Sequence, residues 1–165
     1  MEHQYNVLVT YGSAGYFAAK KEVQAILTKL GDQKAQIDLI APGSIGILTK
    51  IPAKKLVEDL RELYLSDPEV LSTTGDWIPL EYWCASTVPA VVKVIRDEVR
   101  ELIGSGEAYA FQIQGTIDQG ALLQAVVPYI SGKISDERPS KIIFLAVFPE
   151  GTAVSLLAQK DIFKR

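Results

Sequence analysis

The alternation of apolar and polar positions divides the first half of the chain into six elements. An apolar residue at every second position indicates a strand, and one at every third or fourth position indicates a helix. Pro52 and Gly31 fit a helix start and a helix stop. The resulting order β-α-β-β-α-β is typical of a ferredoxin-like domain. The six segments are residues 6–11, 14–30, 35–41, 44–50, 52–64 and 78–85.

The second half repeats no part of the first and follows the order α-β-α-β-β. Ser86 or Thr87 can cap its first helix, Asp118 can cap its second, and Glu150-Gly151 predicts a hairpin turn. We therefore predict an α+β protein with two domains packed together, residues 1–85 and residues 86–165. The second-half elements are a helix to about residue 103, a strand at 107–115, a helix at 119–131, and strands at 141–149 and 152–158.

Composition favours a folded domain with a real core, because 48% of the 165 residues are apolar and 22% are charged. No apolar run approaches the roughly 18 to 20 residues that cross a bilayer, and no secretory signal is evident. A single cysteine, Cys84, excludes an internal disulfide and a multi-cysteine metal site, and its apolar strand predicts a buried structural thiol. We expect a cytoplasmic protein without a membrane partner.

Charge argues against a generic nucleic-acid binder, because the formal net charge is −3 and phosphate binding usually needs a basic excess. Residues 1–85 carry 8 Lys and Arg against 11 Asp and Glu, and residues 86–165 carry 9 against 9. Neither half is a basic domain, so DNA is not an expected partner. Any RNA site must be a local patch.

The turn in "TYGSAGYFAAKKE" (10–22) resembles a phosphate loop but lacks both the Walker lysine and the GxGxxG pattern. Ser13 can cap the following helix, and Lys20 and Lys21 in its second turn are within reach of a phosphate. The alternative is a capped helix with two solvated lysines.

The helix over residues 88–103 carries its cations on one ridge. At 100° per residue, Lys93, Arg96 and Arg100 fall within about 60° of one another, opposite the apolar face. Three cations on one ridge can contact an RNA backbone. Asp97 can pair with Lys93, so an ordinary solvated helix face is the alternative.

The C-terminal residues "AQKDIFKR" place Lys160, Lys164 and Arg165 around an apolar pair. They form either a basic end that meets RNA or an ordinary solubilising terminus. No catalytic constellation is visible, because His3 has no recognisable partner and the paired carboxylates are neighbours on helices.

With these elements placed, the chain resembles the THUMP family of RNA-binding proteins, and most closely its stand-alone branch, the adaptor for tRNA cytidine acetylation. Three segments carry the resemblance: "VLVTYGSAGYFAAKKEVQAILTKLGD", "AYAFQIQG" and "KIIFLAVFPEGTAVSLLAQKDIFKR". It implies a ferredoxin-like domain followed by a THUMP-like domain that grips the acceptor end of tRNA. The family strand usually leads into Arg or Lys, whereas this one leads into Gln114-Gly115, so Gln112 and Gln114 are the polar contacts left there.

The resulting hypothesis is a non-catalytic tRNA-binding adaptor, without cofactor or metal, that presents tRNA to a separate enzyme such as a tRNA cytidine acetyltransferase. The alternative is a ferredoxin-like interaction or small-ligand regulatory module that does not bind RNA. The acidic balance and the missing basic residues after the strand favour that alternative.

Overall fold

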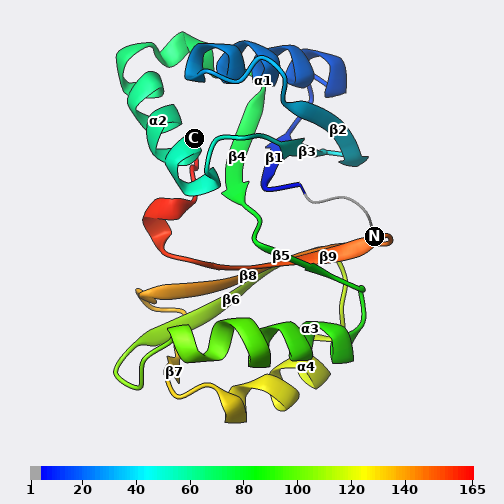
Figure 1. The fold of residues 1–165 in the computed structure, drawn as a ribbon, viewed down its shortest axis with the longest axis vertical. Coiled ribbons are helices and arrows are strands. Elements are labelled where there is room, and N and C mark those ends of the chain that lie inside the picture. The colour runs from blue at the N-terminus through cyan, green and yellow to red at the C-terminus, as the bar shows by residue number, and fades with distance from the viewer. Residues whose placement is uncertain (1–4) are drawn as a thin grey trace. The chain divides into compact units, whose positions relative to one another are not determined.

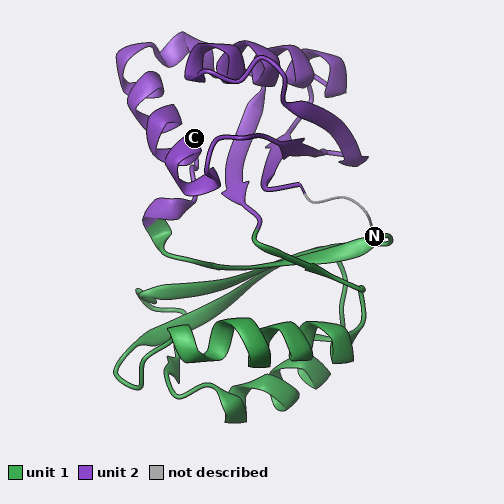
Figure 2. Ribbon diagram, viewed as in Figure 1, with its two compact units in different colours: residues 1–2, 81–159 green, residues 3–80, 160–165 purple. Residues whose placement is uncertain are grey.

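The computed structural model describes residues 5–165, so His3 lies outside the described residues. The chain forms two compact units (Figure 2). Of the described residues, one unit contains 5–80 together with Lys160–Arg165, and the other contains Glu81–Gln159. These units differ from the predicted division at residue 85 in two respects: the change of unit comes five residues earlier, and the last six residues join the first unit.

The first unit contains a four-stranded antiparallel sheet in the order β2-β3-β1-β4, with both helices on one face (Figure 1). Its elements follow the order that the apolar pattern predicts. They are β1 (Val7–Tyr11), α1 (Tyr16–Leu30), β2 (Gln36–Ala41), β3 (Ser44–Leu48), α2 (Ala53–Ser66), a 3-10 turn (Pro68–Val70) and β4 (Thr74–Pro79).

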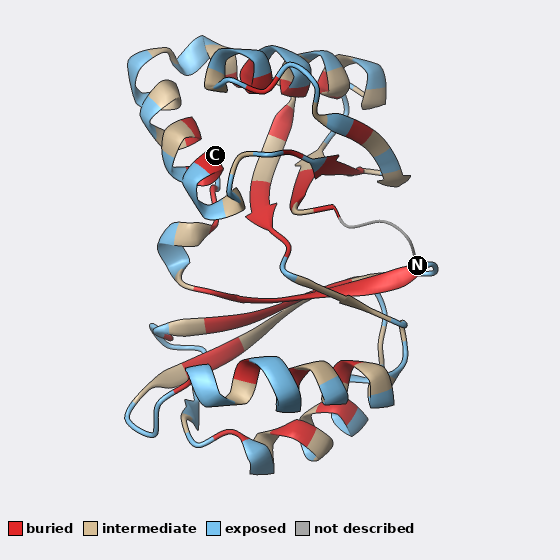
Figure 3. Cartoon of the chain, in the orientation of Figure 1, coloured by how far each residue is buried: buried red, intermediate tan, exposed pale blue. Residues whose placement is uncertain are grey.

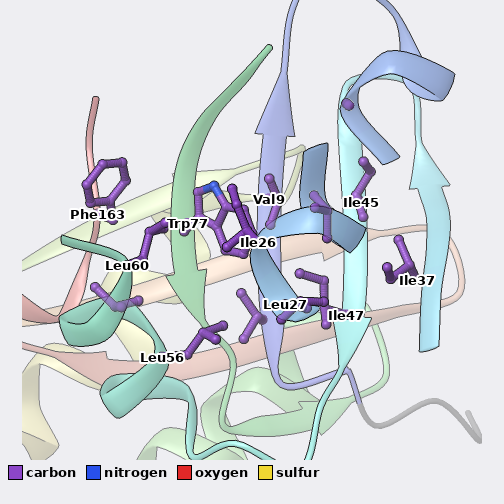
Figure 4. Packing of buried hydrophobic residues seen from close by; sticks show 14 of the residues in the cluster. Val9, Ile26, Leu27, Ile37, Ile45, Ile47, Leu56, Leu60, Trp77 and Phe163 are labelled. Carbon is purple, nitrogen blue, oxygen red and sulfur yellow. The ribbon is translucent and has the colours of Figure 1, made fainter. Parts of the chain in front are cut away.

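The core of this unit lies between the sheet and its helices (Figure 4). Trp77 of β4 and Ile26 of α1 are fully buried in it. Phe163, from the end of the chain, belongs to the same cluster and is 3% exposed. The core of the first unit is therefore completed by Phe163, which lies 86 positions after Trp77 along the chain.

The second unit contains a five-stranded mixed sheet in the order β5-β9-β8-β6-β7. β6 is parallel to β7 and β8, whereas β9 is antiparallel to β5 and β8. Helices α3 and α4 cover one face, and their buried sides meet the sheet (Figure 3). The elements are β5 (Tyr82–Cys84), α3 (Val88–Val94), β6 (Ala108–Gln114), α4 (Gln119–Val126), β7 (Lys133–Ile134), β8 (Lys141–Phe148) and β9 (Gly151–Leu157).

The predicted single strand over residues 78–85 is wrong. β4 ends at Pro79 and pairs with β1, whereas β5 begins at Tyr82 and pairs with β9. Glu81 between them accepts a 2.6 Å hydrogen bond from Leu156 N at its carboxylate, and its own N–H donates to Ser155 Oγ. A continuous apolar run cannot show that its two ends pair with different strands.

Helix caps follow the sequence in three of four cases. Thr87 Oγ1 accepts from Ala90 N, Asp118 Oδ1 accepts from Ala121 N, and Gly31 ends α1 in the left-handed conformation at φ 105°. The predicted Ser13 cap is wrong, because Gly15 occupies the cap position of α1 without any side-chain hydrogen bond.

Both predicted helices of the second unit end early. Residues 95–99 form a π turn and residues 100–102 a 3-10 turn. Steps of four drift about 40° each around an α-helix, so the wider turn helps to keep Val99 and Ile103 in the core. The helix expected over 119–131 becomes a 3-10 turn at Val127–Tyr129, because Pro128 has no N–H to donate.

Candidate nucleic-acid interface

Helix α3 and the turn after it expose Lys93 and Arg96, the first two cations of the predicted ridge. Arg96 Nε lies 3.2 Å from Asp97 Oδ1, so Asp97 pairs with Arg96 and not with Lys93 as expected. Both groups are exposed, and a surface pair of this kind contributes at most about 1 kcal/mol. A phosphate can therefore compete for the guanidinium at low cost.

Arg100 does not share that exposure. The 3-10 turn leaves it half-buried, and its Nε is buried without a hydrogen-bond partner. It lines a groove of about 490 Å³ with Ser105, Ser131 and Tyr129, whose ring is 47% exposed. An unpaired buried N–H costs free energy, and a ligand that accepts from it recovers that cost. The ridge thus contains two exposed cations and a third that faces a groove.

Gln112 and Gln114 lie on the sheet face opposite to α3 and α4. Phe111 and Ile113 pack against the helix-side core, and successive strand residues point to opposite faces. In the parallel pairing with β8, Gln112 lies beside Phe144. The two glutamines and the α3 cations are therefore on different faces of the unit, and they do not form one site.

Gly115, the residue directly after β6, leaves no room for a lysine or arginine side chain at its own position. Its φ of 98° is a left-handed value that favours glycine, and a Cβ there would lie 2.3 Å from Val147 O. Lysine or arginine at this position would require both backbone strain and a shift of β8. At this one position, packing against β8 therefore excludes a basic residue.

The first turn of α1 exposes an aromatic residue near the two lysines predicted to meet a phosphate. Phe17 is 82% exposed, and its ring lies 5.4 Å from that of Tyr16. Lys20 Nζ lies 5.9 Å from the centre of the Tyr16 ring, at the distance of a cation–π contact. Lys21 is exposed. Exposed aromatic rings interleaved with lysines are the pattern on which nucleic-acid bases stack.

The C-terminal cations Lys160, Lys164 and Arg165 are exposed and belong to the first unit. Arg61 of α2 donates to Lys160 O at 2.8 Å and to Ile162 O at 3.3 Å. The sequence predicted α2 as a helix, but its cations Lys54, Lys55 and Arg61, which lie beside this segment, were not among the predicted RNA contacts. Only the charged face of an amphipathic helix marked them, and such a face is common on solvated helices.

Two buried or half-buried carboxylates hold the first unit together without facing any of these cations. Asp32 is 4% exposed and accepts from Thr49 Oγ1 and from the N–H groups of Lys50 and Lys34. The Thr49 hydroxyl, followed by those N–H groups, lowers the pKa of Asp32 despite its burial. Burial alone raises the pKa of Glu22, but hydrogen bonds from residues 72–74 outweigh it, so its pKa is lowered. We assign both carboxylates, Asp32 and Glu22, a structural role.

Cys84 is half-buried against the helix-side core of the second unit, and burial raises the pKa of its thiol. No group of three or more His, Cys, Asp or Glu among residues 5–165 could hold a metal ion. Across the same residues, no helix is both long and apolar enough to cross a membrane.

The fold resembles several solved structures, although no protein-family model matches the sequence and a search of curated proteins finds no match. PH1313 from Pyrococcus horikoshii superposes with a TM-score of 0.62 at 12% identity, over 98% of this chain and 55% of its own. A 4-thiouridine synthetase, solved as a complex with RNA and ATP, matches with a TM-score of 0.56 at 10% identity, over 98% and 42%. TrmN from Thermus thermophilus gives a TM-score of 0.50 at 9% identity, over 91% and 44%.

These likenesses support a THUMP-like α/β fold and, at such low identity, concern the fold alone. The chain spans about half the length of the proteins that it matches.

Proposed function

We propose that this protein binds tRNA and presents it to a separate modification enzyme. The observation that carries the proposal is the fold likeness, along 98% of the chain, to a synthetase that was solved in complex with RNA. The first unit would be the ferredoxin-like part, as its strand order and its β-α-β-β-α-β succession suggest. The second unit would be the THUMP-like part.

The exposed cations of each unit supply the chemistry that backbone binding requires. Lys93 and Arg96 do so on α3 and the turn after it, and Lys21, with the half-buried Lys20 before it, does so on α1, where Phe17 is 82% exposed. Phosphate contacts fix position and orientation without reading sequence, which suits a protein that presents one class of RNA.

We further propose that the protein is a cytoplasmic adaptor without catalysis of its own. By family resemblance, its RNA contact is the acceptor end of tRNA and its partner is a tRNA cytidine acetyltransferase. This part of the proposal depends on the resemblance of the three sequence segments and on the fold likeness, not on any residue cluster.

A titration of tRNA at several salt concentrations tests RNA binding. The logarithm of the association constant should fall linearly with the logarithm of salt concentration, at about 0.7 to 0.9 per phosphate contact. The double variant Lys93→Gln/Arg96→Gln should reduce that slope by up to about 2. Lys29→Gln/Lys34→Gln removes the same charge from exposed positions outside these clusters and should leave the slope nearly unchanged.

Absence of wild-type binding at 50 mM salt would refute RNA binding by this chain and favour the regulatory-module alternative. The adaptor role is tested separately by adding the chain to a tRNA cytidine acetyltransferase and measuring acetylated cytidine. We expect acetylation to depend on the chain and to weaken with the Lys93→Gln/Arg96→Gln variant. Full acetylation without the chain would refute the adaptor role.

A further inference from the structure

The last residues of the chain attach firmly to the first unit. The N–H and C=O groups of Trp77 and Phe163 exchange two hydrogen bonds of 2.9 Å each. The Phe163 ring meets the Tyr64 ring of α2 edge to face, with the ring centres 5.7 Å apart. Packing in the core of the first unit therefore fixes the C-terminal segment beside α2 (Figures 1 and 4).

Arg61 fixes the turn that precedes this attachment. Its Nη2 donates to the carbonyl oxygens of Lys160 and Ile162, which carry no formal charge. The guanidinium thus holds Lys160 and Ile162 beside α2 while its positive charge remains in place. Lys160 comes to lie with cations that are about 100 residues earlier in the sequence.

The result is a groove of about 600 Å³, which we call the α2–C-terminal groove. It contains four cations against two carboxylates, in a chain whose formal net charge is −3. A local positive excess on an acidic protein marks a surface that attracts anions. The lining residues are Lys54, Lys55, Glu58, Arg61, Lys160 and Asp161.

One of the two ion pairs at the groove, Lys55 with Asp59, is weak enough to exchange. Lys54 Nζ lies 3.8 Å from Asp161 Oδ2, and Lys55 Nζ lies 3.2 Å from Asp59 Oδ2. The side chain of Lys55 is 62% exposed, and exposed pairs of this kind contribute at most about 1 kcal/mol. A phosphate oxygen can replace the Asp59 carboxylate beside Lys55, whereas Asp161, whose side chain is 13% exposed, stays in place beside Lys54.

We propose that the α2–C-terminal groove binds the phosphate backbone of RNA, as a second contact besides that of α3. This inference rests on the proposed function. Lysine and arginine without an aromatic side chain line the groove, so it suits the sugar-phosphate backbone and offers no ring for a base to stack on. Glu58 and Asp161 keep its excess charge moderate, which suits a positioning contact more than a sole anchor.

The test uses the full chain with Lys55→Gln/Lys160→Gln, two exposed positions whose change leaves the Arg61 attachment intact. We expect tRNA affinity near 100 mM salt to fall at least about fivefold and the salt slope to fall by up to about 2. Lys29→Gln/Lys34→Gln removes the same net charge elsewhere on the first unit and should bind nearly as the wild type does. Circular dichroism of all three proteins checks that the fold is retained.

The outcomes separate this inference from the proposed function. Wild-type binding that the groove variant retains in full would overturn the groove and leave RNA binding intact. Equal weakening in the groove and control variants would also overturn it, since only net charge would then matter. Absence of wild-type tRNA binding would overturn both proposals. Binding of poly-glutamate in place of tRNA would assign the groove to an acidic protein segment and refute an RNA contact.

Discussion

Glu22 offers the sharpest test of how the first unit is held together, because its carboxylate accepts from three successive residues of another segment. Oε1 accepts from Ser72 N at 2.7 Å, Ser72 Oγ at 3.1 Å and Thr73 N at 3.0 Å. Oε2 accepts from Thr74 N at 2.7 Å. The carboxylate thereby joins the middle of α1 to the chain entering β4.

Glu22→Gln keeps the size of the side chain but replaces one of the two carboxylate oxygens with an NH₂ group, which cannot accept a hydrogen bond from a backbone N–H. An amide oxygen in the Oε1 position leaves an NH₂ group facing Thr74 N, so one charge-assisted hydrogen bond is lost, at about 1.5 to 3 kcal/mol. The bonds that remain go to a neutral acceptor and weaken. We expect the free energy of unfolding of the first unit to fall by about 3 kcal/mol.

Urea denaturation followed by tryptophan fluorescence measures this change. The chain has two tryptophans, so Trp83→Phe leaves Trp77, buried in the first unit, as the reporter. With a slope of about 1 to 3 kcal/mol per molar urea, the midpoint should fall by about 1 to 3 M. Glu62→Gln, an exposed glutamate on α2, is the matched control and should shift the midpoint little.

The pH dependence provides the refuting result. The folded-state pKa of Glu22 lies below its ordinary value of 4.5, so its stabilisation is present above that pH and is lost as pH falls through the folded pKa. The difference between wild type and Glu22→Gln should therefore narrow below about pH 4. The proposed role of the Glu22 hydrogen bonds would be contradicted if Glu22→Gln lowered the free energy of unfolding by less than about 0.5 kcal/mol at neutral pH. It would also be contradicted if the difference between the two proteins stayed the same in acid.

Two further substitutions test the second unit. Tyr109 is fully buried and its hydroxyl has no hydrogen-bond partner. Tyr109→Phe should therefore leave the free energy of unfolding, measured by urea denaturation, unchanged or raise it by up to about 1 kcal/mol. A fall of about 2 kcal/mol would show that the hydroxyl does have a partner. Gly115→Ala should cost at least about 2 kcal/mol in the same assay, because its Cβ would meet Val147 O at a left-handed φ. Gly106→Ala, where a Cβ meets nothing, is the control, and equal effects would disprove the packing argument.

The order of elements could be predicted from sequence because each depends on signals within a few residues. Thr87 and Asp118 reach N–H groups three positions on, and Gly31 adopts the left-handed cap. The hairpin expected at Glu150-Gly151 forms one residue earlier, with Pro149 and Glu150 in the loop and Gly151 paired with Phe148. These are local hydrogen bonds and backbone preferences, which operate wherever the residues stand.

The exposure of the candidate RNA-binding residues was predicted only in part. Lys93, Arg96 and Lys21 are exposed as their helix positions indicate. Arg100 was misplaced, because burial of Val99 in the core depends on a π turn that an ideal helical period does not contain.

By itself, the sequence determined the order of helices and strands, which of their faces are apolar, and that neither half of the chain, residues 1–85 or 86–165, has a basic excess. The tertiary structure alone decided that residues 78–85 divide between two sheets, and that the C-terminal segment returns to bring Lys160 beside Lys54 and Lys55. The physical reason is that a strand's partner and a segment's docking site are chosen by long-range packing. The apolar periodicity predicts that a residue is buried, but it does not indicate which part of the chain packs against it.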